Sequence, residues 1–126
     1  MSEEKLSITV HRFVFKEEQS GGFFCDPAIF VKVDYYGEIF RSKTVYGKAE
    51  LPKFNDTFDL GNGRKDEKIR VSVYSEGCFS NDFIGEVNVY FDSLKVEGGT
   101  KDGFTVLKNG SSLGVIFLES HYTKGE

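Results

Sequence analysis

The feature that most constrains this chain is the alternation of apolar and polar residues in short runs. It is clear at residues 6–10, 29–35 and 69–74. A period of two turns one face of a strand toward a core and the other toward solvent. Nowhere do apolar residues keep the spacing of an amphipathic helix over about three turns. The pattern therefore predicts an all-β fold.

The rest of the sequence predicts how such strands are joined. The chain of 126 residues contains 13 Phe, 6 Tyr and 14 Gly, which favour strands and turns. Further runs occur at residues 39–45, 54–60, 87–91 and 106–117, the last interrupted by the hairpin signal Asn109-Gly110. At Arg12 the apolar phase slips to Phe13 and Phe15, which predicts a β-bulge. We expect an eight-stranded antiparallel Greek-key β-sandwich in a single domain, residues 1–126, with a closed barrel as the alternative.

Charge and targeting signals narrow the classes of function. The formal net charge of −4 argues against binding nucleic acid through bulk electrostatics. The longest clear apolar run, Val115-Ile116-Phe117-Leu118, is much shorter than a bilayer span. The charged opening MSEEKLS lacks an apolar signal segment, so we expect a cytoplasmic protein in which Cys25 and Cys78 are reduced thiols. A redox-controlled disulfide between these cysteines is the open alternative.

No constellation that could perform a reaction is evident in the sequence. The only imidazoles are those of His11 and His121, and both lie in predicted strands. Neither has a nucleophile beside it in a loop, and the sequence contains no GxSxG elbow. The CxxC and HExxH motifs are also absent, which leaves zinc unsupported. We therefore predict that the protein is not an enzyme and that both histidines face solvent or a partner.

Two predicted loops combine carboxylates with aromatic residues that have no alternating strand to occupy. They span residues 17–26 and 75–82, and their aromatic residues are Phe23, Phe24 and Phe79. One interpretation is that these rings fold back onto the end of the core. The other is that they are exposed anchors for a membrane or a partner, since apolar tips of rigid loops often mark interaction sites.

These loops and the segments around them resemble a C2 domain, the membrane-targeting β-sandwich of lipid signalling and vesicle traffic. Pro52-Lys53-Phe54-Asn55-Asp56-Thr57-Phe58 is similar to the family signature P-x-W-N-E-x-F, with Phe54 for the usual Trp and Asp56 for Glu. The other matching segments, in chain order, are residues 6–10, 21–27, 30–33, 43–44, 71–74 with 82–85, and 114–118. The resemblance covers nearly the whole chain and implies a divergent stand-alone member with the circular arrangement called type II.

The resemblance also implies a degenerate calcium site. Of the roughly five carboxylates that the family uses, Asp26 and Asp82 match. The other positions fall on Ser20, Ser75 and Gly77. Glu18 and Glu76 could help only in a remodelled loop. Calcium takes six to eight oxygen ligands, so we expect an affinity of at best about 10⁻⁴–10⁻³ M, no firm cofactor, and function without calcium.

Membrane contact in such a domain would come from the loop tips. Burial of one Phe side chain contributes roughly 1.5–3 kcal/mol. Phe23, Phe24 and Phe79 together could therefore contribute roughly 5–9 kcal/mol, before the costs of ordering and desolvation.

A second contribution could come from basic residues. Many C2 domains present a basic patch on the third and fourth strands to phosphoinositides. Lys32, Arg41 and Lys43 fit that patch, while Asp34 stands where a lysine is usual. The alternative is that these cations form an ordinary solvated strand face.

The sequence thus predicts a non-catalytic domain that docks on phospholipid membranes as a peripheral cytoplasmic protein and binds no nucleic acid. The alternative is a protein-interaction module of the same fold that does not bind lipid. Binding to protein-free lipid vesicles distinguishes the two.

Overall fold

The computed structural model describes residues 5–15, 28–46, 53–61, 68–76, 81–94 and 99–123, most of which lie in strands. The strands are β1 (Lys5–Phe15), β2 (Ala28–Tyr35), β3 (Glu38–Arg41), β4 (Val45–Tyr46), β5 (Lys53–Gly61), β6 (Lys68–Glu76), β7 (Asn81–Tyr90), β8 (Thr100–Lys108) and β9 (Ser111–Thr123). A 3₁₀ turn, η1 (Phe91–Leu94), follows β7. The predicted all-β class is confirmed.

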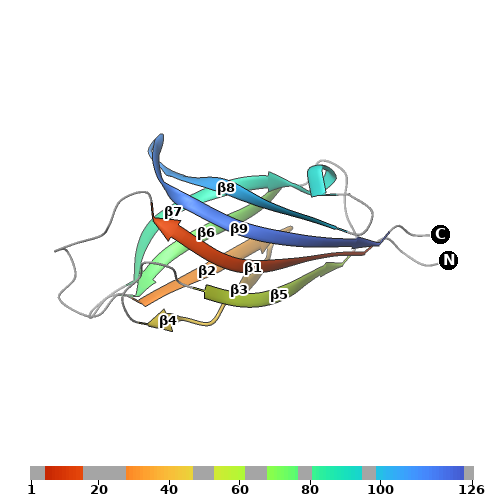
Figure 1. Ribbon diagram of the computed structural model, residues 1–126, viewed down its shortest axis with the longest axis horizontal. Coiled ribbons are helices and arrows are strands. Elements are labelled where there is room, and N and C mark those ends of the chain that lie inside the picture. The colour runs from red at the N-terminus through yellow and green to blue at the C-terminus, as the bar shows by residue number, and fades with distance from the viewer. Residues whose placement is uncertain are drawn as a thin grey trace.

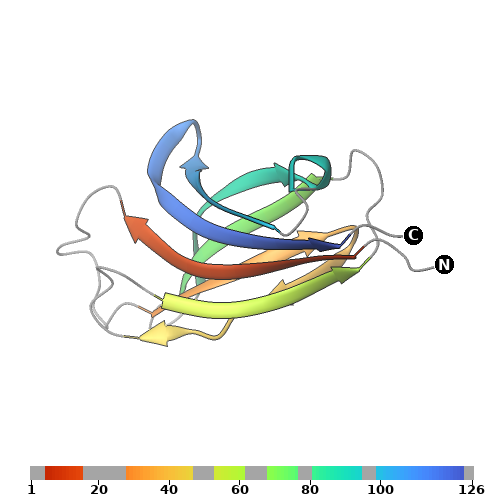
Figure 2. The same ribbon diagram turned by 45° about the vertical axis from the view of Figure 1, so that its right-hand side comes forward.

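The strands form two antiparallel layers (Figures 1 and 2). One layer has the order β3-β2-β6-β7 and the other the order β8-β9-β1-β5, while β4 pairs with β2. One register pair, Glu86 with Leu107, joins β7 to β8. The eight strands of this path are the predicted sandwich, and the two-residue β4 is an addition to it. The last strand, β9, lies next to the first, β1.

The core lies between the two layers and is built from alternate residues of the strands. Ile8, Val31, Val71 and Ile116, each from a different strand, have no exposed surface. Phe54, which stands for the signature tryptophan, is also fully buried. Each such side chain stabilises the fold by roughly 1.5–3 kcal/mol. Because neighbouring strand residues face opposite sides, the period of two in the sequence becomes one apolar interior and two polar outer faces.

Two local predictions are confirmed by the backbone. The register of β1 against both β5 and β9 shifts between Val10 and Arg12. Against β9, where the partners of these two residues are consecutive, His11 is the extra residue of a β-bulge. Asn109 and Gly110 have φ values of 52° and 83°. Positive φ at both central residues is the requirement of the two-residue hairpin turn that this sequence predicts.

The predicted loop at residues 75–82 is wrong at both ends. β6 continues through Ser75 and Glu76, and β7 already begins at Asn81, opposite Glu76. The extension was missed because Ser75, a polar residue, occupies a buried strand position. The predicted run at residues 39–45 is divided in the structure into β3 and β4, which residues 42–44 connect.

Three of the segments that link strands connect at one end of the sandwich. The last residues of β1, β4 and β6 and the first residues of β2, β5 and β7 lie together there, at the left in Figure 1, and both chain termini lie at the opposite end. Segments 16–27, 47–52 and 77–80 join these strand ends. The two aromatic segments singled out in the sequence are therefore anchored at the same end.

Candidate functional site

The predicted membrane-inserting tips and two of the four predicted calcium ligands belong to these connecting segments. Phe23, Phe24, Phe79, Asp26 and Glu18 lie outside the described residues, as do Cys25 and Cys78. The backbone of Asp82 lies in β7, where it pairs with Ser75 of β6. The insertion of these aromatic residues and the calcium ligands therefore remain predictions.

Two of the predicted basic residues are brought together on the outer face of the β3-β2-β6-β7 layer. Lys32 of β2 and Arg41 of β3 are direct register partners. The same face carries Asp34, which pairs with Ile39 of β3 and Arg70 of β6. The face is thus mixed in charge, and its cations gather on the rows occupied by Lys32 and Arg41.

These two cations lie over aromatic rings. The guanidinium carbon of Arg41 is 3.9 Å from the ring centre of Phe30, and Nζ of Lys32 is 5.0 Å from that of Tyr74. Phe30 and Tyr74 stack on each other with centroids 5.2 Å apart, and Tyr74 meets Phe83 edge-on at 5.6 Å. We call Phe30, Lys32, Arg41, Tyr74 and Phe83 the cation–aromatic cluster. A cation over a ring within about 6 Å is stabilised by roughly 0.5–2 kcal/mol.

Carboxylates balance part of this charge. Oε1 of Glu76 lies 3.9 Å from Nη2 of Arg41, and Oε2 of Glu86 lies 3.2 Å from Nε of Arg70. Arg41 also donates a hydrogen bond of 3.3 Å to Oγ1 of Thr44. Within the described part of the chain, no carboxylate lies within ion-pair distance of Lys32. Lys32 is thus the less compensated of the two clustered cations.

Lys43, the third predicted basic residue, is held differently. Its backbone N–H donates a hydrogen bond of 2.8 Å to Oδ2 of Asp56, which lies in β5 of the other layer. Its side chain is exposed and makes no ion pair or ring contact with the other described residues. The geometry therefore joins Lys32 and Arg41 in one cluster and leaves Lys43 beside it.

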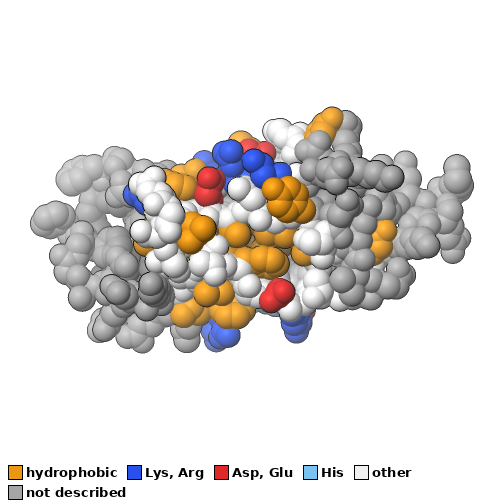
Figure 3. All heavy atoms as spheres, turned by 90° about the horizontal axis from the view of Figure 1, so that it is seen from above, with side chains coloured by type: hydrophobic (Ala, Val, Ile, Leu, Met, Phe, Trp, Pro, Cys, Tyr) orange, Lys and Arg blue, Asp and Glu red, His pale blue; other side chains and the backbone are white. Residues whose placement is uncertain are grey.

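An apolar surface is also present, and it includes Phe83 of the cation–aromatic cluster. Seen from above the view of Figure 1, hydrophobic side chains gather in the middle of the surface, with Lys and Arg side chains at its borders (Figure 3). Among the described residues, β7 and β8 carry three large apolar side chains that are exposed, those of Phe83, Tyr90 and Leu107. Apolar surface of this kind is typical of interaction sites.

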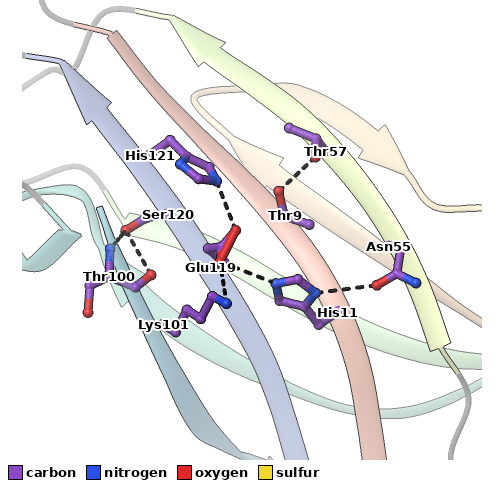
Figure 4. A network of polar contacts seen from close by, with 9 residues as sticks. All are labelled: Thr9, His11, Asn55, Thr57, Thr100, Lys101, Glu119, Ser120 and His121. Carbon is purple, nitrogen blue, oxygen red and sulfur yellow. Dashed lines mark hydrogen bonds and ion pairs between the residues drawn. The ribbon is translucent and has the colours of Figure 1, made fainter. Parts of the chain in front are cut away.

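The outer face of the β8-β9-β1-β5 layer holds a polar network centred on Glu119 (Figure 4). Nζ of Lys101 lies 3.1 Å from Oε1 of Glu119, and Nε2 of His121 donates to Oε2 at 2.9 Å. Nε2 of His11 is buried 3.7 Å from Oε1, while its Nδ1 donates to Oδ1 of Asn55 at 3.3 Å. Both histidines lie on this outer face as predicted, with side chains that are 34% exposed for His11 and 55% exposed for His121, and both also contact the same carboxylate.

The hydrogen bond from Lys101 is the main cause of a lowered pKa at Glu119, with a further contribution from His121. Desolvation of the carboxylate raises the pKa, but by less than the contacts with Lys101 and His121 lower it. Glu119 is therefore the charged centre of this face. The sequence alone did not reveal the network, because Lys101, Glu119 and His11 come from three strands.

The described residues contain no group of three or more His, Cys, Asp and Glu side chains that could hold a metal ion. Nor does this part of the chain include a helix with the length and hydrophobicity needed to cross a membrane.

Comparisons with known proteins place this geometry in a family. The C2 domain family model matches residues 4–106. No curated protein sequence matches significantly. A C2 domain of plant extended synaptotagmin 1 is similar in structure, with a TM-score of 0.79 and 17% identity over 100% of this chain and 98% of that chain.

Two further structures of C2 domains are similar to this chain. The calcium-bound pair of C2 domains of extended synaptotagmin 2 gives a TM-score of 0.78 at 14% identity, covering 97% of this chain and 46% of that chain. A structure described as a C2 domain gives 0.72 at 15% identity, covering 96% of this chain and 99% of that chain. At these identities the structural likeness shows the fold. Because the family model spans most of the sequence, the chain belongs to the C2 domain family.

Proposed function

We propose that this C2 domain is a non-catalytic module that docks on phospholipid membranes at their cytoplasmic face. Docking uses the end of the sandwich that carries segments 16–27 and 77–80, together with the cation–aromatic cluster. Phe23, Phe24 and Phe79 supply the apolar contact, while Lys32 and Arg41 attract anionic headgroups.

The observation that carries this proposal is the position of Arg41 and Lys32 over the stacked rings of Phe30 and Tyr74. The ring leaves the N–H edge of the guanidinium uncovered, so the N–H groups of Arg41 that Thr44 and Glu76 do not engage can reach phosphate oxygens. Holding the guanidinium in advance lowers the entropy lost on binding. Each basic residue near an anionic leaflet contributes about 1 kcal/mol. The pair alone gives weak attraction, so the apolar tips must supply most of the affinity.

We further propose that docking depends weakly on calcium or not at all. Asp26 and Asp82 are the two residues that match family ligands, and two carboxylates fall short of the six to eight oxygens that calcium takes. Glu76, a candidate helper, lies 3.9 Å from Arg41. A calcium ion would have to compete with that guanidinium for the carboxylate.

Vesicle co-sedimentation tests the proposal. Purified protein is mixed with phosphatidylcholine vesicles and with vesicles that also contain phosphatidylserine, each with calcium and with chelator. We expect binding to the anionic vesicles in both ionic conditions, and a clear loss on Phe24→Ala. Binding only with calcium would overturn the calcium proposal, and no binding in any condition would overturn membrane docking.

The alternative function, a protein-interaction module, has a separate observation in its favour. The exposed apolar side chains of β7 and β8 and the hydrophobic surface in Figure 3 could pack against a protein. This alternative predicts no binding to protein-free vesicles, so the same experiment distinguishes it from docking on lipid.

A further inference from the structure

A groove on the outer face of the β8-β9-β1-β5 layer has no part in the proposed membrane contact. Its volume is about 400 Å³, and its lining includes His11, Arg12, Lys53, Asn55, Lys101 and Phe117. Pockets for small ligands commonly measure about 300–1,000 Å³. The groove is therefore large enough for a small ligand, and its lining is dominated by cationic and polar side chains.

The β-bulge in β1 creates this concentration of charge. β1 pairs Val10 with Asp56 and then Arg12 with Lys53, so both strands carry unpaired residues between these two register pairs. Asn55, in the interval on β5, has a positive φ of 53°. A bulge breaks the alternation of side chains, which allows the neighbours His11 and Arg12 to share one face. His11 contacts Glu119, and Arg12 contacts Phe117. Glu119 and Phe117 are two positions apart on β9 and so face the same side, which places His11 and Arg12 together on the outer face.

Arg12 is fixed in the groove by an aromatic ring. Its guanidinium carbon lies 4.6 Å from the ring centre of Phe117. Phe117 in turn lies against Gly103 of β8, where a Cβ atom would come within 3.0 Å of Cε1 of the ring. The glycine leaves room for the ring, and the ring supports the guanidinium. Arg12 therefore presents its N–H groups in a defined place.

The charges around the groove do not cancel. Lys101 pairs with Glu119, which leaves the cations Arg12 and Lys53 against one further carboxylate, that of Asp102. Asp102, the acidic residue of the lining, accepts a hydrogen bond of 2.9 Å from the backbone N–H of Gly103. Arg12 and Lys53 make no ion pair with any carboxylate in the described parts of the chain. Two adjacent cations of the groove are thus available to an anion.

We propose that this groove binds the phosphate groups of a multiply phosphorylated small ligand, with Arg12 and Lys53 as its main contacts. The planar guanidinium donates two parallel hydrogen bonds to phosphate oxygens, and the lysine adds a mobile positive charge. The groove and the cation–aromatic cluster lie on opposite layers of the sandwich. The proposal is therefore independent of membrane docking, and each site can be altered without the other.

The test uses the full chain and two sources of the same chemistry. Inositol trisphosphate is titrated into ¹⁵N-labelled protein, and binding is also measured on phosphatidylcholine vesicles with and without phosphatidylinositol bisphosphate. We expect the free phosphate to shift the amide resonances of the groove strands β1 and β5. The double variant Arg12→Gln/Lys53→Gln should raise the Kd about tenfold or more, since a hydrogen bond to a charged group is worth about 1.5–3 kcal/mol.

Two further variants separate the explanations. Lys5→Gln/Lys68→Gln removes the same formal charge away from the groove, and it should change the Kd less than about twofold. Lys32→Gln/Arg41→Gln should leave the groove resonances responding as in the wild type. If Arg12→Gln/Lys53→Gln weakens binding to the phosphatidylinositol bisphosphate vesicles but not to free inositol trisphosphate, the phosphate comes from a lipid headgroup. The proposal is overturned if Arg12→Gln/Lys53→Gln, with an unchanged melting curve, binds both sources as the wild type does.

Discussion

The guanidinium of Arg41 covers the ring of Phe30, with the guanidinium carbon 3.9 Å from the ring centre. Phe30 is fully buried, although it projects from β2 on the side opposite to the core residues Ile29 and Val31. A phenylalanine on an outer strand face would ordinarily be exposed. Here Arg41 and the stacked ring of Tyr74 cover it, so the cluster that presents the cations also shields an apolar side chain.

This relationship can be measured by a double-mutant cycle. Arg41→Gln and Phe30→Leu are made singly and together, and the free energy of unfolding is measured in urea. We expect a coupling energy of about 0.5–2 kcal/mol. The lower value is typical of cation–π contacts exposed to solvent, and the higher value of contacts from which water is excluded. Strictly additive effects would show that the contact does not hold Arg41 in place. The control is a second cycle with Arg41→Gln and Phe40→Leu. Because Phe40 packs against the core and not against Arg41, the two changes should be additive.

The pairing of Glu76 with Arg41 predicts a gain of function. Glu76→Gln removes the carboxylate that lies 3.9 Å from the guanidinium. Arg41 then meets anionic lipid without a competing negative charge, and binding to phosphatidylserine vesicles should rise about two- to fivefold. Glu38→Gln, an exposed carboxylate on the same edge strand as Arg41, is the matched control. An equal rise in both variants would assign the effect to net charge alone.

Glu119 predicts how stability depends on acidity. Its pKa is lowered in the folded protein, chiefly by the hydrogen bond from Lys101, from an ordinary value of 4.5. The ionised form therefore favours folding above about pH 4.5, and this contribution is lost as the pH falls through the lowered pKa. Glu119→Gln should lower the Tm near neutral pH. The difference from the wild type should shrink as the pH falls below the ordinary value of 4.5 and through the lowered pKa.

Differential scanning calorimetry across this pH range checks the prediction. Glu38→Gln removes a carboxylate outside the network and provides the comparison. A Tm difference for Glu119→Gln that stays constant down to strongly acid pH would contradict the assigned role of Glu119.

At Gly114 the addition of a single methyl group should destabilise the fold. A Cβ atom there would collide with the backbone oxygen of Val14 and lie 2.8 Å from Cζ of Phe13. Neither neighbour can move easily, because one is paired backbone and the other is a fully buried ring. Gly114→Ala should lower the free energy of unfolding by about 1–3 kcal/mol or more. Gly110→Ala is the comparison, since nothing lies within 4 Å of a Cβ there and only the positive φ of 83° opposes alanine; a loss at Gly110 greater than at Gly114 would contradict the steric explanation.

Much of the fold could be predicted because period-two alternation is a local signal. The bulge at Arg12 and the turn at Asn109-Gly110 were readable for the same reason: each is encoded by a few neighbouring residues. The ends of β6 and β7 were not readable. Ser75 is polar, and its burial depends on a partner strand that the local sequence does not reveal.

The candidate site was predicted less completely, since it depends on which strands are neighbours. Lys32 and Arg41 were identified through family resemblance, but the rings beneath them were not. A signal did exist, because Phe30 and Tyr74 lie out of phase with the core residues of their strands. The Glu119 network and the groove gave no such signal. They join residues from β1, β5, β8 and β9, and their contacts follow from the register between strands.

The central claim is that the Lys32 and Arg41 face contributes to docking on anionic membranes. Its most direct test is the affinity of three proteins for phosphatidylserine vesicles in chelator: the wild type, Lys32→Gln/Arg41→Gln, and the charge-matched Lys5→Gln/Lys68→Gln. At about 1 kcal/mol for each basic residue at the membrane, the first variant should bind about tenfold or more weakly than the wild type, and the second should stay close to it. Equal binding by all three proteins would contradict the account.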